Sequence, residues 1–482
     1  MGISILIIMA VYFAVLYLIS VLVSRKDSDN DAFFMGNRKS PWWAVAIAMV
    51  GTSISGVTFV SVPGWVRESD MTYMQMAFGF FFGYLVVAFL LLPLYYRMNL
   101  ITIYGYLEQR FGKWSYKTGS VFFILSKLIG AAARLYLVAM ILQLLVFTHW
   151  GIPFYATVTG IILLIWLYTH RSGIKTIIWT DMLQTICFLT ALVLIIWQVA
   201  IRLDLNFTGV VDVVQQSKHF RIFVFDDWGS KQNFFKQFFS GVFITIVMTG
   251  LDQDMMQKNL TCKSLKDAKK NMIIYGAMFA PINFLFLSLG ILLLAFASQQ
   301  QLVLPDLSDK ILPMLAEGYL GFPVLVFFTV GIVAAAFSSA DSALTALTTT
   351  VCVDLLDVKR EEALKAKKIR KKAHVVVSIV FGIIIVTIDY LGQSSIIDAI
   401  YKIASYTYGP LLGLFSFGLF TKIKINDKFV PFVCILSPFL CYAVEVFLHN
   451  WFDYNMGYEV LMLNGLLTMF GLLLLKKRTI TL

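Results

Sequence analysis

Residues 51–58 read "GTSISGVT" and interrupt an apolar stretch that extends from residue 42 to residue 66. About 20 consecutive apolar residues are enough for a helix to cross the hydrocarbon core of a bilayer, so the stretch predicts a membrane helix. Glycines and small hydroxyl residues in its middle favour a break, and a broken helix exposes backbone carbonyls that can coordinate sodium. The same small residues are also typical of a tight contact between two membrane helices, so this stretch alone leaves both interpretations open.

The whole chain shares this apolar character. Of its 482 residues, 59% are hydrophobic and only 14% are charged, whereas a soluble domain carries about 25% charged residues. The composition therefore predicts an all-α polytopic membrane protein. About thirteen transmembrane helices are expected, near residues 3–23, 42–66, 73–96, 118–147, 152–169, 176–201, 237–252, 271–297, 322–353, 373–390, 396–420, 429–448 and 457–475.

Positive charge is distributed unevenly among the loops that connect these spans. The chain has a net charge of +11, and alternate loops hold 29 of its 39 Lys and Arg residues, against 7 in the loops of the other side. Because basic loops stay in the cytoplasm, we expect the N-terminus outside, the C-terminus in the cytoplasm, and a multi-pass protein of the plasma (inner) membrane. The basic excess then reflects topology and contact with anionic membrane lipid rather than a nucleic-acid partner.

The sequence contains no recognisable catalytic motif. A P-loop, a G-x-S-x-G elbow and an H-E-x-x-H motif are all missing, and each of these would indicate hydrolysis or group transfer. The five cysteines are scattered and form neither a disulfide framework nor a metal-binding pattern. We therefore do not expect an enzyme.

The ninth span contains a second polar stretch, "FSSADSALTALTTT", at residues 337–350. Ala335, Ser338, Ser339 and Ser342 follow the i, i+3, i+4, i+7 spacing, so they share one helical face, and Asp341 borders that face. Hydroxyl and carbonyl oxygens suit a hard cation such as Na⁺, although serines also join membrane helices. Asp341 favours the ion site, because a carboxylate at the bilayer centre costs about 3 kcal/mol or more and needs a cation, a proton or a basic partner.

Other charged residues fall within the predicted spans. Asp181, in "HRSGIKTIIWTDMLQ", could pair with Lys175 near the cytoplasmic surface or lie on an ion pathway. Lys127 and Arg134 are seven residues apart and therefore share a helical face. These two cations could pair with Asp181, Asp341 or Asp252, or they could receive an anionic group of a substrate.

Two further stretches indicate a broken helix and a cavity. The seventh span ends in "TGLDQDMMQKNLT", where a glycine and paired aspartates predict another helix break or a helix end. In "YKIASYTYGPLLG", Tyr401, Lys402, Tyr406 and Tyr408 could line a polar cavity, although aromatic residues in such a stretch are more often part of the core.

The order and spacing of several stretches resemble the sodium:solute symporter family, which includes sodium/glucose cotransporters, proline permease and bacterial sialic acid transporters. The resemblance covers residues 5–475. It is carried by "DAFFMGNRKSPWWAVAIAMVGTSISGVTFVSVPG", "ITIYGYLEQRFG", "GIKTIIWTDMLQ", "DMMQKNLTCKSLKDAKK" and "AAAFSSADSALTALTTTVCVDLL".

The resemblance implies a LeuT-like fold of two inverted five-helix repeats, in which the first helix of each repeat is broken. The expected organisation is an extra N-terminal transmembrane helix (1–25), a first repeat (40–201), an extracytoplasmic loop (202–235), a second repeat (236–421) and C-terminal transmembrane helices (427–475).

The family's sodium site maps onto specific positions of this chain. The resemblance implies that Na⁺ binds the backbone carbonyls of Gly51, Ile54 and Ala335 and the hydroxyls of Ser338 and Ser339.

A second sodium site, known in the sialic acid branch, is similar to Asp181, Asp341 and Ser342 here. This chain departs from that branch at Asp341, where the branch has a serine. The extra carboxylate could strengthen an ion site or bind a proton.

The substrate site matches the sialic acid branch less well. The segment "TSISGVTF" is similar to that branch, but its glutamine and arginine in the next two helices are replaced here by Ala77 and Gly130. Arg134 lies about one turn from Gly130 and could substitute for the arginine. The expected substrate contacts are therefore Ser53, Ser55, Thr58 and Arg134.

The resemblance implies a secondary active transporter that uses Na⁺ as coupling ion and imports a small polar organic solute by alternating access. The solute would be a sugar, a sugar acid such as sialic acid, or a similar compound. A proton-coupled symporter is an alternative, because Asp341 could titrate. A solute sensor is a further alternative, although a sensor usually carries a signalling domain and this chain ends at "KKRTITL". The sequence leaves the number of sodium ions and the oligomeric state open, a monomer included.

Overall fold

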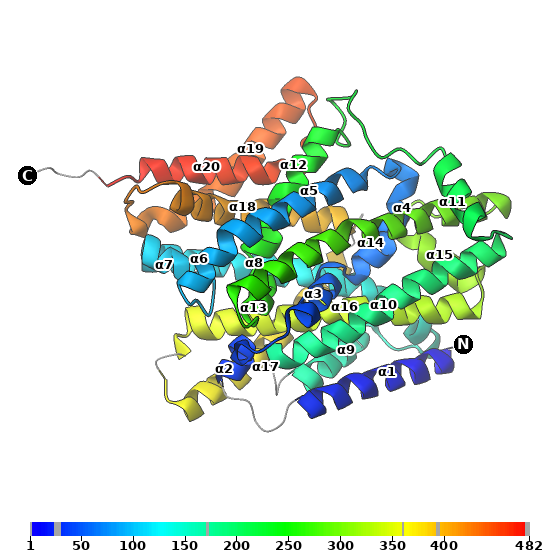
Figure 1. Cartoon of the computed structure of the whole chain (residues 1–482), viewed down its shortest axis with the longest axis horizontal. Helices are drawn as coiled ribbons and strands as arrows, with labels where there is room; N and C mark the ends of the chain where they lie inside the picture. The colour runs from blue at the N-terminus through cyan, green and yellow to red at the C-terminus, as the bar shows by residue number, and fades with distance from the viewer. Residues whose placement is uncertain (1, 24–29, 170–172, 359–360, 392–395, 478–482) are drawn as a thin grey trace, which may run out of the picture.

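The computed structural model describes residues 2–23, 30–169, 173–358, 361–391 and 396–477. Within these ranges every regular element is a helix, and extended residues meet only in two isolated bridges. The axes of most of the long helices lie roughly along the longest axis of the molecule (Figure 1). The prediction of an all-α polytopic membrane protein is therefore confirmed.

Nine helical segments in the described part of the chain are long and apolar enough to cross a membrane. Two shorter apolar helices, α9 (Phe154–Thr169) and α20 (Val460–Leu474), coincide with two further predicted spans. The long helices are α1 (Gly2–Val23), α5 (Tyr73–Val86) continuing into α6 (Leu92–Arg97), α8 (Lys113–Leu142), α10 (Ile174–Arg202), α14 (Leu265–Gln299), α16 (Phe322–Thr350), α17 (Ala363–Leu391), α18 (Ile396–Phe420) and α19 (Val430–Phe452).

Two further spans are broken helices. Helices α3 (Trp42–Ser53) and α4 (Gly56–Ser69) meet at an angle of 59°. The α12 helix (Phe234–Thr245) continues as a π-helical turn to Gly250 and is then bent by 63° against α13 (Gln253–Leu260). Both breaks lie where the sequence predicts them. With each bent pair taken as one span, eleven spans satisfy the length and composition required, and the total of thirteen stays a prediction.

Each break has a local cause. Ile54 leaves the helical region, with φ −85° and ψ 86°. A Cβ on Gly56 would lie 2.5 Å from Val138 and 3.3 Å from the carbonyl of Ile332, so only glycine lets α4 approach α8 and α16 this closely. At the second break, the Asp252 side chain accepts hydrogen bonds from the backbone N–H groups of Asp254 and Met255 and so caps the start of α13.

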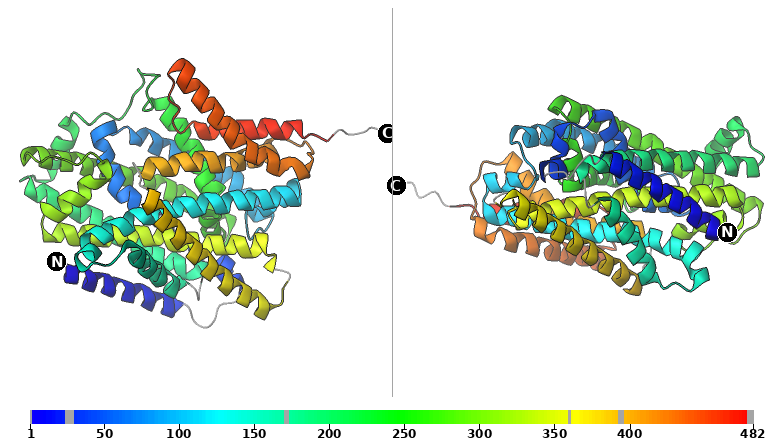
Figure 2. Two further views of the ribbon diagram at one scale, coloured as in Figure 1. Left: turned by 180° about the vertical axis from the view of Figure 1, so that it is seen from behind. Right: turned by 90° about the horizontal axis from the view of Figure 1, so that it is seen from below.

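The two ends of the bundle carry different connecting elements. One end, here called the α11 end, carries α11 (Phe207–Gln216) and α15 (Ile311–Gly318), and the opposite α7 end carries α7 (Gly105–Arg110). Helix α1 begins at the α11 end and α20 ends at the α7 end (Figure 1). Figure 2 shows α1 lying along the outside of the bundle, where most of its surface stays exposed.

Helix α16 forms the centre of the bundle. Every residue from Gly331 to Thr350 is buried, and α16 packs closely against α10 and also contacts α3, α4 and α8. The polar residues of this helix therefore face other helices rather than lipid. This burial brings the polar stretch of α16 next to the break between α3 and α4.

Candidate functional site

The first predicted sodium site lies where the end of α3 meets α16. A Cβ on Gly51 would lie 2.2 Å from Thr185 Oγ1 and 3.1 Å from Ser338 Oγ, so Gly51 is in direct contact with both α10 and α16. Because α3 ends at Ser53, the Gly51 carbonyl belongs to the last turn, whose carbonyls have no partner further along the helix. The structure thus brings Gly51 and Ser338 together, as predicted.

The two serines of this site differ in their hydrogen bonds. Ser338 Oγ is buried beside the Asp181 carboxylate but makes no hydrogen bond of normal geometry to any residue that the structure describes. Ser339 donates its proton to the carbonyl of Ala336 at 2.9 Å, and its oxygen can still accept or bind a cation. Oxygen ligands of this kind suit Na⁺. The cation itself stays a prediction, as do the roles of Ile54 and Ala335.

Gly51→Ala is expected to destabilise the protein by about 1–3 kcal/mol, because the new methyl group would overlap Thr185 and force α3 away from α10. The melting temperature of the purified protein measures this loss. Gly160→Ala is the matched control, since a Cβ there would meet no atom within 4 Å. Equal melting temperatures for the two variants would contradict the tight contact at Gly51.

The second predicted ion site contains a basic residue that the sequence did not single out. Asp181 Oδ2 accepts hydrogen bonds from Ser342 at 3.0 Å and from Thr52 at 3.1 Å. The ammonium group of Lys258, on α13, lies 2.5 Å from the same oxygen and also donates to Thr52. Asp181 and Ser342 therefore meet as expected, and the ion-pair partner of Asp181 is Lys258 rather than Lys175. Asp341 is also fully buried on α16, and its predicted role as an ion ligand stays a prediction.

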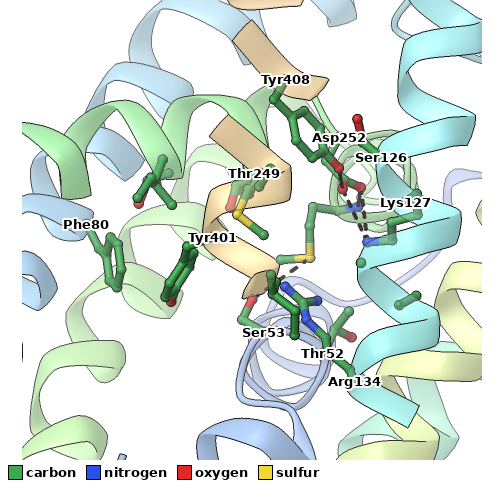
Figure 3. A pocket seen from close by; sticks show the side chains of 18 of the residues that line it. Thr52, Ser53, Phe80, Ser126, Lys127, Arg134, Thr249, Asp252, Tyr401 and Tyr408 are labelled. Carbon is green, nitrogen blue, oxygen red and sulfur yellow. Dashed lines mark hydrogen bonds and ion pairs between the residues drawn. The ribbon is translucent and has the colours of Figure 1, made fainter. Parts of the chain in front are cut away.

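Lys127 forms the second buried ion-pair cluster. Its ammonium group lies 3.2 Å from Asp252 and 2.7 Å from Asp254, and Tyr408 donates to Asp252 at 2.7 Å. Figure 3 shows Lys127, Asp252 and Tyr408 at one side of a cavity that is lined by residues of α3, α5, α8, α12, α13, α14 and α18. One of the partners considered for Lys127, Asp252, is thus confirmed, and the positive charge of Lys127 is already balanced.

Arg134 lies in the same cavity without such a partner. Its side chain extends from α8 toward Ser53 (Figure 3). Among the residues that the structure describes, Arg134 makes neither an ion pair nor a side-chain hydrogen bond. Gly130, one turn earlier, also lines the cavity, and a Cβ there would meet no atom within 4 Å, so the space beside it is open. The cavity therefore presents one guanidinium group that has no direct ion-pair partner among the described residues.

Of the predicted substrate contacts, only Ser53 and Arg134 line this cavity. Ser53 Oγ lies 2.5 Å from Tyr275 Oη, which is 2.8 Å from Tyr84 Oη. Ser55 and Thr58 are buried at the start of α4 and are not part of the cavity wall in the described structure. The wall also includes residues that the sequence did not single out: Phe80, Tyr84, Ser126, Thr245, Met248, Thr249, Met255 and Phe279.

The residues of the stretch "YKIASYTYG" have two different roles. Tyr401 and Tyr408 line the cavity, whereas Lys402 pairs with Glu445 at 3.1 Å and Tyr406 donates to the same carboxylate. Tyr401 and Tyr408 therefore line a cavity, and Tyr408 is also part of the buried core, so both interpretations of this stretch apply.

Aromatic residues close the cavity toward the α11 end. The hydroxyl groups of Tyr73 and Tyr401 are 3.1 Å apart, and the ring of Tyr401 packs against Tyr458 at 5.2 Å. Beyond them lies a second, polar hollow whose wall includes Glu68, Lys231, Gln232, Lys402 and Glu445. At the opposite side, Tyr95 and Tyr104 donate to the carbonyls of Gly250 and Leu251 and hold the second helix break in place.

Comparison with known proteins places these features in a family. The family model described as "Sodium:solute symporter family" matches residues 33–428. The sodium/sialic acid symporter SiaT of Proteus mirabilis (strain HI4320) is 25% identical over 417 residues, which cover 85% of this chain and 83% of that protein. The sodium/sialic acid symporter NanT of Aliivibrio fischeri (strain ATCC 700601 / ES114) is 25% identical over 467 residues, covering 95% and 91% of the two chains.

Solved structures agree with the fold. A Na⁺-coupled sialic acid symporter in a substrate-bound, outward-open state superposes with a TM-score of 0.83 at 22% identity, covering 98% of this chain and 97% of that chain. A nucleobase-cation-symport-1 family transporter in a closed conformation superposes with a TM-score of 0.54 at 15% identity, covering 92% and 93%. The predicted LeuT-like architecture is confirmed by the first of these likenesses.

Proposed function

This chain belongs to the sodium:solute symporter family, and we propose that it imports a small organic anion together with Na⁺ bound between α3 and α16. It is a multi-pass membrane transporter that couples solute transport to sodium. The observation that carries the choice of an anion is the unpaired guanidinium of Arg134 in the central cavity. Arg134 is partly buried, and a carboxylate of the solute would supply the ion-pair partner that its guanidinium lacks among the described residues.

The solute site is proposed to combine Arg134 with hydroxyl groups around it. Ser53, Thr249 and Tyr401 line the cavity and offer donors and acceptors to a polar solute. An arginine can bind a carboxylate through two parallel hydrogen bonds. Two relatives are named sodium/sialic acid symporters, and sialic acid is a sugar with a carboxylate. A sugar acid of this kind is therefore the solute class that we propose to test first.

The sodium ion is proposed to bind the carbonyls of Gly51, Ile54 and Ala335 and the hydroxyls of Ser338 and Ser339. The ion would tie the broken span α3–α4 to α16 and stabilise the state in which the cavity faces the α11 end. A ligand shifts such an equilibrium only by its difference in affinity for the two states. The relatives named above are sodium symporters, which does not favour the proton-coupled alternative.

The orientation in the membrane is part of the proposal. The loops of the α7 end carry most of the basic residues, and such loops face the cytoplasm. We place α11 and the start of α1 outside the cell and the end of α20 in the cytoplasm, in the plasma (inner) membrane. The solute would then enter past Tyr73 and Tyr401 and leave when the α7 end opens.

Arg134→Gln is expected to weaken binding of a carboxylate solute about 10- to 100-fold, because a hydrogen bond to a charged group contributes about 1.5–3 kcal/mol. A thermal-shift screen of the purified protein in Na⁺ buffer would compare N-acetylneuraminic acid and pyruvate with neutral glucose, since a bound ligand raises the melting temperature. Uptake of the hits into proteoliposomes under a Na⁺ gradient would follow.

The control for this experiment is Arg221→Gln, which removes an exposed arginine outside the cavity. That variant should bind the hits as tightly as the wild type. Hits that are exclusively neutral, with affinities unchanged by Arg134→Gln, would contradict an anionic solute.

A further inference from the structure

One oxygen of the Asp181 carboxylate, which was expected to bind a second sodium ion with Asp341 and Ser342, is already surrounded by donors. Asp181 Oδ2 receives the Lys258 ammonium at 2.5 Å, the Ser342 hydroxyl at 3.0 Å and the Thr52 hydroxyl at 3.1 Å. The side chains of Lys258 and Asp181 are both fully buried, with 0% exposure. One positive charge and two neutral donors thus occupy this carboxylate oxygen.

The cation in this position is part of the protein. Lys258 lies on α13, the second half of the broken span of the second repeat, whereas Asp181 lies on α10. Its ammonium group also donates to Thr52, which is adjacent to Gly51 of the proposed sodium site. An ammonium has the charge of Na⁺ but can only donate hydrogen bonds, so Ser342 and Thr52 turn their protons toward Asp181.

We infer that Lys258 is a tethered cation that takes the place of a second sodium ion at Asp181 and Ser342, so that the carrier binds a single Na⁺. A second Na⁺ on the same carboxylate oxygen would have to displace the ammonium or lie against a like charge. The inference rests on the proposed function, which places the single ion at Ser338 and Ser339. It also gives α13 a charged attachment to α10.

The test counts sodium ions on the purified full-length protein with radioactive ²²Na⁺ as the probe. The wild type is expected to bind one ion with a Hill coefficient near one. Lys258→Met removes the ammonium and frees Asp181 and Ser342, so this variant is expected to bind two ions with a Hill coefficient above one. Lys258→Arg keeps the charge and should bind one ion. The double variant Lys258→Met with Ser342→Ala should lose the second ion again.

The outcomes separate this inference from the proposed function. If the wild type binds two ions, the inference that Lys258 replaces the second sodium ion is wrong, whereas the proposed first sodium site is unaffected. A Lys258→Met protein that folds but still binds one ion would overturn it as well. If Lys258→Met does not fold, the number of ²²Na⁺ ions bound by the wild type alone decides whether the inference holds. Loss of all saturable ²²Na⁺ binding in the Ser338→Ala, Ser339→Ala double variant, with one ion in the wild type, would support both.

Discussion

Replacing Ser338 and Ser339 together by alanine is expected to raise the Na⁺ concentration for half-maximal solute uptake about 100-fold or more. The two hydroxyls are proposed ligands of the ion, and interactions of a polar group with a charge contribute about 1.5–3 kcal/mol each. Ser338→Ala alone should have the larger effect, because Ser338 Oγ makes no normal hydrogen bond to the described residues whereas Ser339 already donates to Ala336. Sodium-dependent uptake in proteoliposomes measures the change.

A hydroxyl elsewhere on the same helix provides the control. Thr329 is buried on α16 and donates to the carbonyl of Leu325 at 2.8 Å, nine residues before Ser338. Thr329→Ala should leave the sodium dependence unchanged even if it lowers the melting temperature. If the double serine variant has the same sodium dependence as the wild type, the proposed sodium site is wrong.

Much of the fold could be predicted because its causes are local in the sequence. Each apolar stretch is long enough to be a membrane helix on its own, and the helices of the structure coincide with all the predicted stretches. The break near Gly51 and Ser55 could be predicted because glycine and small hydroxyl residues favour it. Helix α17 is longer than expected: it begins at Ala363, because its basic first turns are good helix formers that need not lie in the membrane.

The pairing of buried charges could not be predicted in the same way. The sequence placed Lys127, Arg134 and Asp181 inside spans, but other acidic and basic residues lie in or beside the spans, so many pairings are possible. The choice depends on how far α13 turns after its break, because that angle directs Lys258 toward Asp181 and leaves Asp254 beside Lys127. A bend of 63° is a property of tertiary packing. The stretch "DMMQKNL" around Lys258 is largely polar and contains no sign that this lysine is buried.

Lys127→Met is expected to destabilise the protein by about 3–5 kcal/mol, the usual cost of leaving a buried charge without its partner. Lys127 is the ion-pair partner of both Asp252 and Asp254, and all three side chains are at least nine-tenths buried. Asp252 also caps α13, so repulsion between the two carboxylates would act directly on the second helix break. The melting temperature of the solute-free protein measures this destabilisation and should be lower in the variant. Lys113→Met, at the exposed start of the same helix, should change it little.

A triple variant shows whether Lys127→Met loses stability through the change in charge or through the change in side-chain shape. Adding Asp252→Asn and Asp254→Asn to Lys127→Met removes all three charges, and asparagine can still cap a helix. Replacing a complete buried ion cluster by neutral residues is often close to neutral for stability. The triple variant should therefore regain most of the stability that Lys127→Met loses. If the triple variant is as unstable as Lys127→Met, the loss of stability does not come from the broken ion pairs at the second helix break. It would then come from the lost packing of the lysine side chain in the cavity wall.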